Sequence, residues 1–205
     1  MSITLYHHDI PESFVRSQGV LALDTEAMGL EPFRDRLCVV QMSWGDGQCA
    51  LVQFFPGAQP EATNLKTMLA NPQIEKLFHF GRFDMALMLR TFGVRCQPVY
   101  CTKIASRLAR TYTDRHGLKD LCQELLGVGL SKSEQSSDWG RDVLSPEQKK
   151  YAAGDVLHLH ALRKKLDIIL KRENRLRLAQ QCFQALQTRV DLDVAGFADD
   201  IFRHV

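Results

Sequence analysis

In the stretch VLALDTEAMG, residues 20–29, an apolar run ends on two acidic residues, and this pair decides which fold and function the sequence predicts. Val20 to Leu23 form a continuous apolar run, which predicts a strand that enters a core. Asp24 and Glu26 follow, with one residue between them. Because charged side chains are rarely buried without a partner, something must neutralise this pair or expose it to water.

Asp24 and Glu26 have the spacing of two side chains on one face of a strand. Their Cα atoms would then lie about 6.6 Å apart, where two like charges repel by about 2.5 kcal/mol at an effective dielectric constant of about 20. Two explanations remain open for the pair alone, namely a solvated strand end and a bound cation. If a cation binds, the carboxylate oxygens favour Mg²⁺ or Mn²⁺ over zinc.

The composition limits the class of protein. The chain has 205 residues, 45% of them hydrophobic and 24% charged, which predicts an ordinary folded domain. A net charge of only +2 argues against a large basic field for long duplexes, although nucleic acid held by local contacts remains possible. The six cysteines include no C-x-x-C pair, so we expect reduced thiols rather than a zinc site or a disulfide framework. No secretion signal or bilayer-length apolar run is evident, and we expect a soluble, cytoplasmic protein without membrane contact.

The pattern of apolar residues predicts strands first and helices later. Early strands are predicted over Val20–Asp24, Leu37–Ser43 and Gln48–Val52, and an Asp-Gly turn between the last two favours an antiparallel meander. Short strands are then expected over 76–80 and 98–102, and helices over 64–70, 82–93, 117–127 and, as one long element, 146–173. This order predicts an α/β fold in which a mixed sheet is flanked by helices, with a helical C-terminal part.

Further polar residues stand where apolar ones are expected. Asp84 interrupts the apolar pattern in the first turns of a predicted helix, where an acid also simply favours the helix dipole. Tyr151 and Asp155 are four residues apart and therefore share a helix face. A core-facing side that carries a phenol and a carboxylate needs partners for both. We therefore expect Asp24, Glu26, Asp84, Tyr151 and Asp155 to converge at one site.

This set of residues resembles the DEDD superfamily of 3′–5′ exonucleases, on the tyrosine branch that includes ribonuclease D. The blocks HGLKDLCQELLG, LSKSEQSSDW and LSPEQKKYAAGDVLHLHALRKKL extend the resemblance over about residues 20–166. Two departures are visible: DTEAMGL has the D-x-E-x-x-G-L form of oligoribonuclease, and the chain stops before the accessory helical domains of ribonuclease D would fit. A single-domain chain of this kind is similar to the nano-RNase C family, which degrades dinucleotides and other short oligoribonucleotides.

The resemblance implies a ribonuclease H-like exonuclease domain over residues 1–170. Residues 171–205 would form a C-terminal helix and tail, as part of that domain or as an oligomer contact. It also implies two divalent cations, Mg²⁺ or Mn²⁺, with Asp24 bridging them, Glu26 and Asp155 completing the first site and Asp84 holding the second. Tyr151 would orient the attacking water, and activity would rise at alkaline pH.

Substrate contacts are also expected from the resemblance. The residues concerned are Thr25, Met28, Leu30, His79, Lys132 and Gln135. Leu30 would press between the last two bases, with a plain core leucine as the alternative. His79 would meet a phosphate oxygen, with a structural histidine as the alternative. Lys132 and Gln135 would close one side of the pocket with Trp139.

Other features have simpler interpretations. We expect His158 and His160 to pack within their helix rather than act as ligands. The basic residues between Arg163 and Arg177 are predicted to form a solvated helix face, which would affect the salt dependence of binding if it guided RNA. The resemblance implies a homo-oligomer, and the apolar tail residues Phe197, Ile201 and Phe202 are a plausible contact.

Three functions remain open at this point, two of them enzymes and the third from a different class. The first is a metal-dependent 3′–5′ exoribonuclease for short oligoribonucleotides, dinucleotides above all. The second keeps the chemistry but trims longer structured RNA, such as tRNA 3′ ends, or single-stranded DNA. The third is an inactive module that binds RNA or protein, against which the presence of all four acids and the tyrosine counts.

Overall fold

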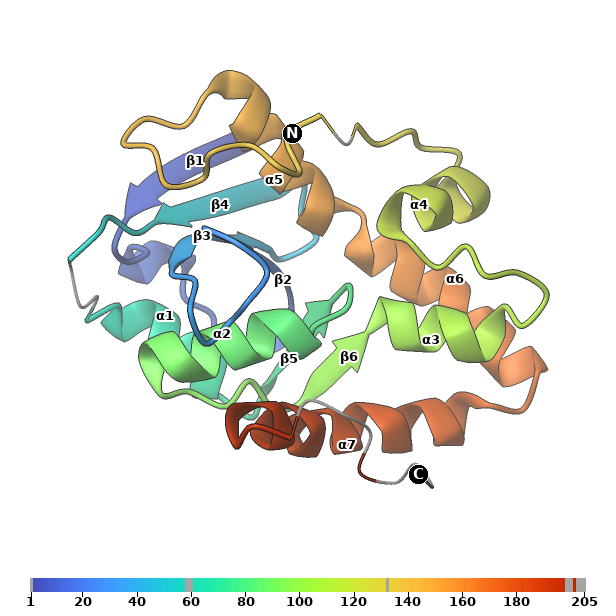
Figure 1. Ribbon diagram of the computed structural model, residues 1–205. Coiled ribbons are helices and arrows are strands. Elements are labelled where there is room, and N and C mark those ends of the chain that lie inside the picture. Colours follow the sequence, from blue (N-terminus) through green and yellow to red (C-terminus); the bar gives the residue numbers. More distant parts are fainter. Residues whose placement is uncertain (1, 58–60, 132, 198–200, 202–205) are drawn as a thin grey trace.

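A six-stranded mixed sheet with the strand order β1-β4-β3-β2-β5-β6 forms the centre of the molecule (Figure 1). The computed structural model describes residues 2–57, 61–131, 133–197 and 201. The strands are β1 (Ser2–His7), β2 (Gly19–Ala27), β3 (Leu37–Ser43), β4 (Gln48–Gln53), β5 (Ile74–Phe78) and β6 (Val99–Cys101). β3 pairs antiparallel with both β2 and β4, whereas β1 pairs with β4, β5 with β2, and β6 with β5, all in parallel. The predicted mixed sheet and its meander are therefore confirmed.

Helices cover the sheet and extend beyond it. They are α1 (Thr63–Ala70), α2 (Arg82–Phe92), α3 (Thr102–Ala109), α4 (Leu118–Leu126), α5 (Pro146–Leu157), α6 (Leu159–Arg172) and α7 (Leu176–Val194), with a 3₁₀ turn over Glu12–Phe14. α5 packs on β2, β3 and β4. α7 runs along the bottom of Figure 1 and packs against α2 and β6, so the C-terminal helix contacts the sheet domain.

Two elements differ from the sequence prediction. β1 was not predicted, because this edge strand has no fully buried residue and carries no continuous apolar run. The single long helix predicted over 146–173 is wrong, since the chain breaks it at His158 into α5 and α6. Val156, Leu159 and Leu162 are all buried across the break, so the apolar pattern gives no sign of it.

Local sequence signals fix the ends of the helices near the site. α2 and α4 end at Gly93 and Gly127, whose φ angles of 70° and 69° lie in the left-handed region that glycine tolerates. α5 begins with a capping box, in which the Ser145 side chain accepts from the Gln148 backbone N–H and the Gln148 side chain accepts from the Ser145 backbone N–H. Pro146 occupies the first turn. The start of α5, and with it the position of its functional face, is therefore set by sequence-local contacts.

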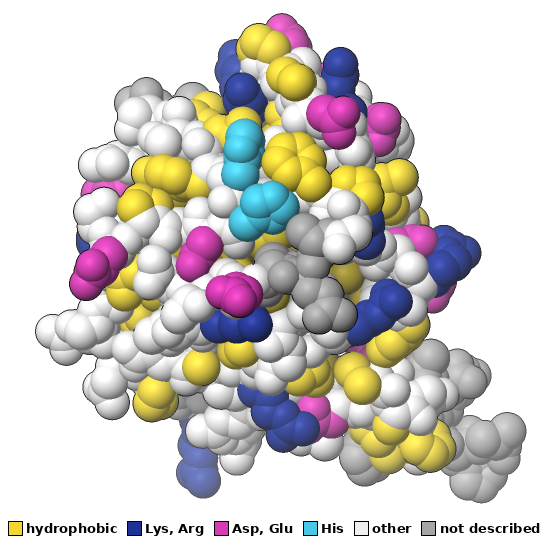
Figure 2. Space-filling model, turned by 90° about the vertical axis from the view of Figure 1, so that its left-hand side faces the viewer, with side chains coloured by type: hydrophobic (Ala, Val, Ile, Leu, Met, Phe, Trp, Pro, Cys, Tyr) yellow, Lys and Arg dark blue, Asp and Glu magenta, His cyan; other side chains and the backbone are white. Residues whose placement is uncertain are grey.

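The core and surface match the composition. β3 is buried at every position, and Cys38, like four of the other five cysteines, is a buried free thiol, which confirms the expectation for the cysteines. On the face drawn in Figure 2, basic and acidic side chains are interspersed among hydrophobic ones, in keeping with the small net charge. Among the helices that the structure describes, none combines the length and apolar character needed to cross a bilayer.

Candidate active site

β2 carries the first two acids of the site out of the core. Leu21, Ala22 and Leu23 have no exposed surface, and the strand becomes partly exposed from Asp24 onward. The pairing with β3 shifts between Glu26 and Ala27, so the strand is irregular just where its acids lie. Such irregularities re-aim side chains at the end of a ladder.

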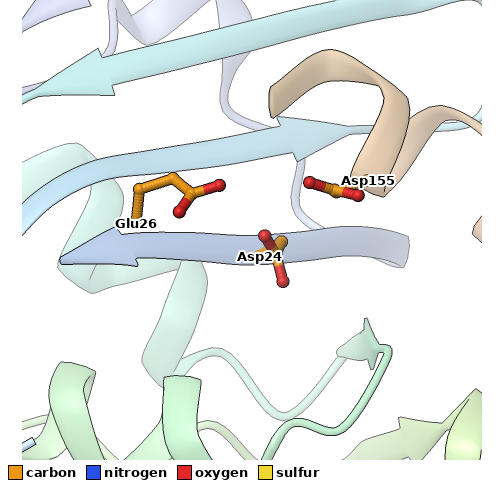
Figure 3. Close-up of side chains that lie close together, drawn as sticks. All are labelled: Asp24, Glu26 and Asp155. Carbon is orange, nitrogen blue, oxygen red and sulfur yellow. The ribbon is translucent and has the colours of Figure 1, made fainter. Parts of the chain in front are cut away.

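Asp155 on α5 joins Asp24 and Glu26 in one carboxylate cluster. Each of the three residues offers an oxygen, and these oxygens all lie within 4.8 Å of one another. Figure 3 shows the carboxylates of the two β2 acids and that of Asp155 turned toward the same space. Oxygen ligands bind Mg²⁺ at about 2.0–2.1 Å and can therefore lie up to about 4.2 Å apart around one ion, so shifts of a few tenths of an ångström bring all three groups onto one cation.

Asp84 approaches from α2 and is held apart from this cluster. It is only 4% exposed, and its Oδ1 accepts a hydrogen bond of 2.6 Å from the Thr25 hydroxyl. Thr25 alternates with Asp24 and Glu26 along β2, so its side chain leaves the opposite face of the strand. We expected Thr25 as a substrate contact. The structure places its hydroxyl on Asp84, although the residue also lines the cavity.

All four acids have raised pKa values, with burial as the largest cause. Burial and then the charge of Asp155 raise the pKa of Glu26 to about 9, and burial raises the pKa of Asp84 to about 7. The pKa of Asp155 rises to about 7 through burial and Asp84, and that of Asp24 rises well above its ordinary value through burial and all three other acids. The cluster therefore holds either protons or cations, and its all-oxygen donor set fits hard divalent cations.

Tyr151 lies one helical turn before Asp155 on α5. Its ring is 6.0 Å from that of Trp139, centroid to centroid. Burial, followed by the charges of Asp155, Glu26 and Asp24, raises the pKa of Tyr151 above its ordinary value of 10. The phenol is therefore protonated at neutral pH and is a hydrogen-bond donor rather than a base.

A cavity of about 840 Å³ opens over these residues. All five predicted catalytic residues line it, and so do five of the expected substrate contacts: Thr25, Met28, Leu30, His79 and Gln135. Leu30 is 86% exposed, so the alternative interpretation of this residue as a core leucine is wrong. Trp139 also lines the cavity, whereas Lys132 lies outside the described residues.

A hydrogen bond fixes the ring orientation of His79, which lines the cavity. Its Nδ1 lies 2.9 Å from the Thr102 hydroxyl, which in turn donates to the Phe78 carbonyl oxygen. Nδ1 must then donate to Thr102, so the neutral ring carries no proton on Nε2. Burial and the Lys103 charge lower the pKa of His79 to about 3. A contact from Nε2 to a phosphate oxygen would thus require a second proton on the ring.

Several residues of the site carried no signal in the sequence. Gln41 on β3 donates from its Nε2 to Asp24 Oδ2 at 2.8 Å, a contact that depends on strand pairing. Phe80 lines the cavity with an unusual φ of 69°, and the Lys103 ammonium lies 4.1 Å from its ring centroid. Residues 117–119, at the start of α4, form another wall.

Residues outside the site have structural partners. The His160 Nε2 lies 2.9 Å from the Val20 carbonyl oxygen, which places this ring in the packing between α6 and β2. In the basic segment, Arg163 pairs with Glu75 and lies over the Tyr100 ring. Its charge is therefore used within the fold rather than left wholly to solvent.

Comparison with known proteins links this geometry to nucleases. The family model described as 3′–5′ exonuclease matches residues 9–171. Ribonuclease D of Granulibacter bethesdensis is 33% identical over 162 residues, which are 79% of this chain and 40% of that protein. The chain thus spans about 40% of the length of the curated relatives that it matches.

Solved structures give the same result. Brucella melitensis NrnC bound to pGG is 50% identical, with a TM-score of 0.95 and full coverage of both chains. The same protein with bound Mg²⁺ is also 50% identical, with a TM-score of 0.94. Escherichia coli RNase D is 29% identical with a TM-score of 0.75, over 87% of this chain and 46% of that one. These likenesses confirm the expected exonuclease fold, with its mixed sheet and helical C-terminal part.

Proposed function

Because the chain belongs to the 3′–5′ exonuclease family, on its ribonuclease D-like branch, we propose that it is a metal-dependent exoribonuclease of short oligoribonucleotides, dinucleotides above all. The products would be nucleoside monophosphates. One observation carries the proposal: oxygens of Asp24, Glu26 and Asp155 lie within 4.8 Å of one another, and all three residues line one cavity.

The acids would hold two divalent cations, Mg²⁺ or Mn²⁺. Asp24, Glu26 and Asp155 form the cluster that suits the first cation, and Asp84 would serve the second from the side of α2. When bound, the cations would stabilise the charge that develops on the attacking and leaving oxygens of the phosphodiester. The Mg²⁺ bound in the NrnC structure, at 50% identity, supports this assignment.

Tyr151 would orient the attacking water through its hydroxyl. Its raised pKa keeps the proton on the phenol at neutral pH, so the residue would position the water and not deprotonate it. A rise of activity toward alkaline pH, as expected from the resemblance, would then come from loss of protons by the crowded carboxylates and the water.

The size of the cavity supports a short substrate. About 840 Å³ lies within the usual range for sites that enclose a small ligand, roughly 300–1,000 Å³. Met28 and Leu30, which are 53% and 86% exposed, offer apolar surface on which bases would stack. That NrnC was solved with pGG further supports a dinucleotide.

A homo-oligomer and a cytoplasmic location stay predictions. A second copy would cover the exposed apolar side chains of Val194, Phe197 and Ile201, which lie at the end of α7 and just after it. Phe202 lies outside the described residues. Light scattering after size exclusion, on the wild type and on Phe197→Glu, tests the assembly.

Hydrolysis of 5′-labelled RNAs of two to about ten nucleotides, in Mg²⁺ and in Mn²⁺, tests the substrate class. We expect a sharp preference for the dinucleotide, abolished by Asp24→Ala. Equal stepwise trimming of every length, or of single-stranded DNA, would instead support the ribonuclease D-like alternative. Absence of cleavage in both metals would favour a binding module.

A further inference from the structure

We propose that Gln41 is a positioning residue of the metal centre, whose uncharged amide nitrogen holds Asp24 and Glu26 in the arrangement that binds divalent cations. The inference rests on the proposed function, because it assumes that these acids are metal ligands. Gln41 reaches the acids from the neighbouring strand and has no contact with the cavity surface, since none of its own surface is exposed.

The strand register brings Gln41 to this position. Asp24 on β2 and Gln41 on β3 are direct partners in the antiparallel ladder, so their side chains leave the same face of the sheet. The Gln41 Nε2 donates to Asp24 Oδ2 at 2.8 Å, and the Gln41 amide also partly offsets the raised pKa of Glu26. An amide nitrogen has two N–H donors, so the bond to Asp24 leaves a second N–H on the side of the acids.

The other end of the same amide is left without a partner. Gln41 Oε1 is buried and accepts no hydrogen bond from any described residue. Turning the amide over would place this oxygen against two carboxylates and is therefore worse. A buried acceptor without a donor is normally avoided, so retaining it indicates that the nitrogen is needed at the acids.

The lack of charge on the amide is part of the argument. A lysine or arginine at this position would also donate hydrogen bonds, but it would neutralise the acids and compete with the cations. Glutamine orients the oxygens and leaves their negative charge for the metal. Groups that orient metal ligands in this way typically change metal affinity or activity by about 10- to 100-fold when they are removed.

Gln53 provides a matched control within the same sheet. It lies on β4, is 2% exposed, and also has a buried Oε1 without a described partner. Its Nε2 donates instead to the backbone oxygens of Arg141 and Asp142. Gln53→Met thus removes an equivalent buried amide that does not touch the acids.

Mn²⁺ binding followed by the electron paramagnetic resonance signal of free Mn²⁺ tests the proposal without relying on turnover. For Gln41→Met we expect the Mn²⁺ dissociation constant to rise about 10- to 100-fold. Gln53→Met should stay within about twofold of the wild type. Raising Mn²⁺ should restore most of the kcat of Gln41→Met, with KM for the dinucleotide unchanged. Gln41→Asn, which keeps the amide but withdraws it by one methylene, serves if the methionine variant fails to fold.

The outcomes separate the two proposals. If the wild type binds no Mn²⁺, the proposed function itself is wrong. If the wild type binds and Gln41→Met and Gln41→Asn bind equally well, only the role of Gln41 is wrong. An equal loss in Gln41→Met and Gln53→Met would also overturn it, because the effect would then belong to buried amides in general.

Discussion

Replacing Glu26 by glutamine should stabilise the metal-free protein, and by more at pH 8 than at pH 5. Two unit charges separated by the 4.8 Å of the cluster repel by about 3.5 kcal/mol at an effective dielectric constant of about 20. Glu26 faces both Asp24 and Asp155, so full ionisation would cost about twice that amount. Holding a proton is the cheaper way to relieve this repulsion at pH 8, in agreement with the pKa of Glu26 being raised to about 9.

The cost of that proton sets the magnitude. From the ordinary pKa of 4.5, keeping Glu26 protonated costs about 5 kcal/mol at pH 8 and about 1 kcal/mol at pH 5, at 1.36 kcal/mol per pH unit. The folded state binds more protons than the unfolded chain between these pKa values, so the free energy of unfolding falls as pH rises from about 4.5 to about 9. Glutamine at this position has no proton to hold and removes this penalty.

Urea unfolding in EDTA, followed by circular dichroism at pH 5 and pH 8, measures the effect. We expect Glu26→Gln to gain several kcal/mol at pH 8 and no more than about 1 kcal/mol at pH 5, with the exposed Glu12→Gln as a control that changes neither. Adding Mg²⁺ at a hundredfold excess over the wild-type dissociation constant should reduce the advantage of the variant at pH 8, since the wild type, which keeps all of its acids, gains about 2.7 kcal/mol. Equal gains at the two pH values would falsify the electrostatic argument.

Three further substitutions test separate parts of the molecule. Tyr151→Phe should lower kcat by about 10²-fold or more without changing Mn²⁺ affinity, because it removes only the hydroxyl; full turnover of the labelled dinucleotide would exclude its role. Gly29→Ala would place a Cβ 2.2 Å from Asp35 Oδ2, so either the loop that carries Leu30 or the Asp35 carboxylate, which accepts from the Glu31 backbone N–H of that loop, must shift, and we expect a severalfold higher KM with unchanged Mn²⁺ binding. Lys76 is fully buried with its ammonium on the Asn71 and Gln97 carbonyl oxygens, and burial lowers its pKa to about 8. Between pH 8 and about 10.5 the unfolded chain therefore binds more protons, so urea unfolding should show wild-type stability rising over this window and no such rise in Lys76→Met.

Features that depend on short sequence spacings were predictable. The i, i+2 spacing of Asp24 and Glu26 and the i, i+4 spacing of Tyr151 and Asp155 fix shared faces without knowledge of the fold. The glycine after α4 and the proline at the start of α5 likewise act within one turn. Such contacts are decided by local backbone geometry alone, so the strands and helices around the site could be predicted from the sequence.

Features that depend on distant partners were not predictable. Gln41 meets Asp24 only because of the register between β2 and β3. The proton position on His79 is set by Thr102, 23 residues away, and the break at His158 leaves no trace in the apolar pattern. The separation of Asp84 from the three other acids also follows from a long-range contact, its hydrogen bond with Thr25 across 59 residues.

The buried acids of this chain differ in whether their hydrogen-bond donors are charged or neutral, and the difference indicates which acids bind ligands. Asp193 is 8% exposed and receives hydrogen bonds from both Arg82 and Arg189, which lower its pKa although burial alone would raise it. Among the described residues, the side chains that donate to the acids of the site are neutral, namely the Gln41 amide and the Thr25 hydroxyl, and no ion pair involves these acids. Arginine was therefore available to this fold as a solution for a buried carboxylate, and its absence here leaves the negative charge of the acids for the divalent cations that we propose.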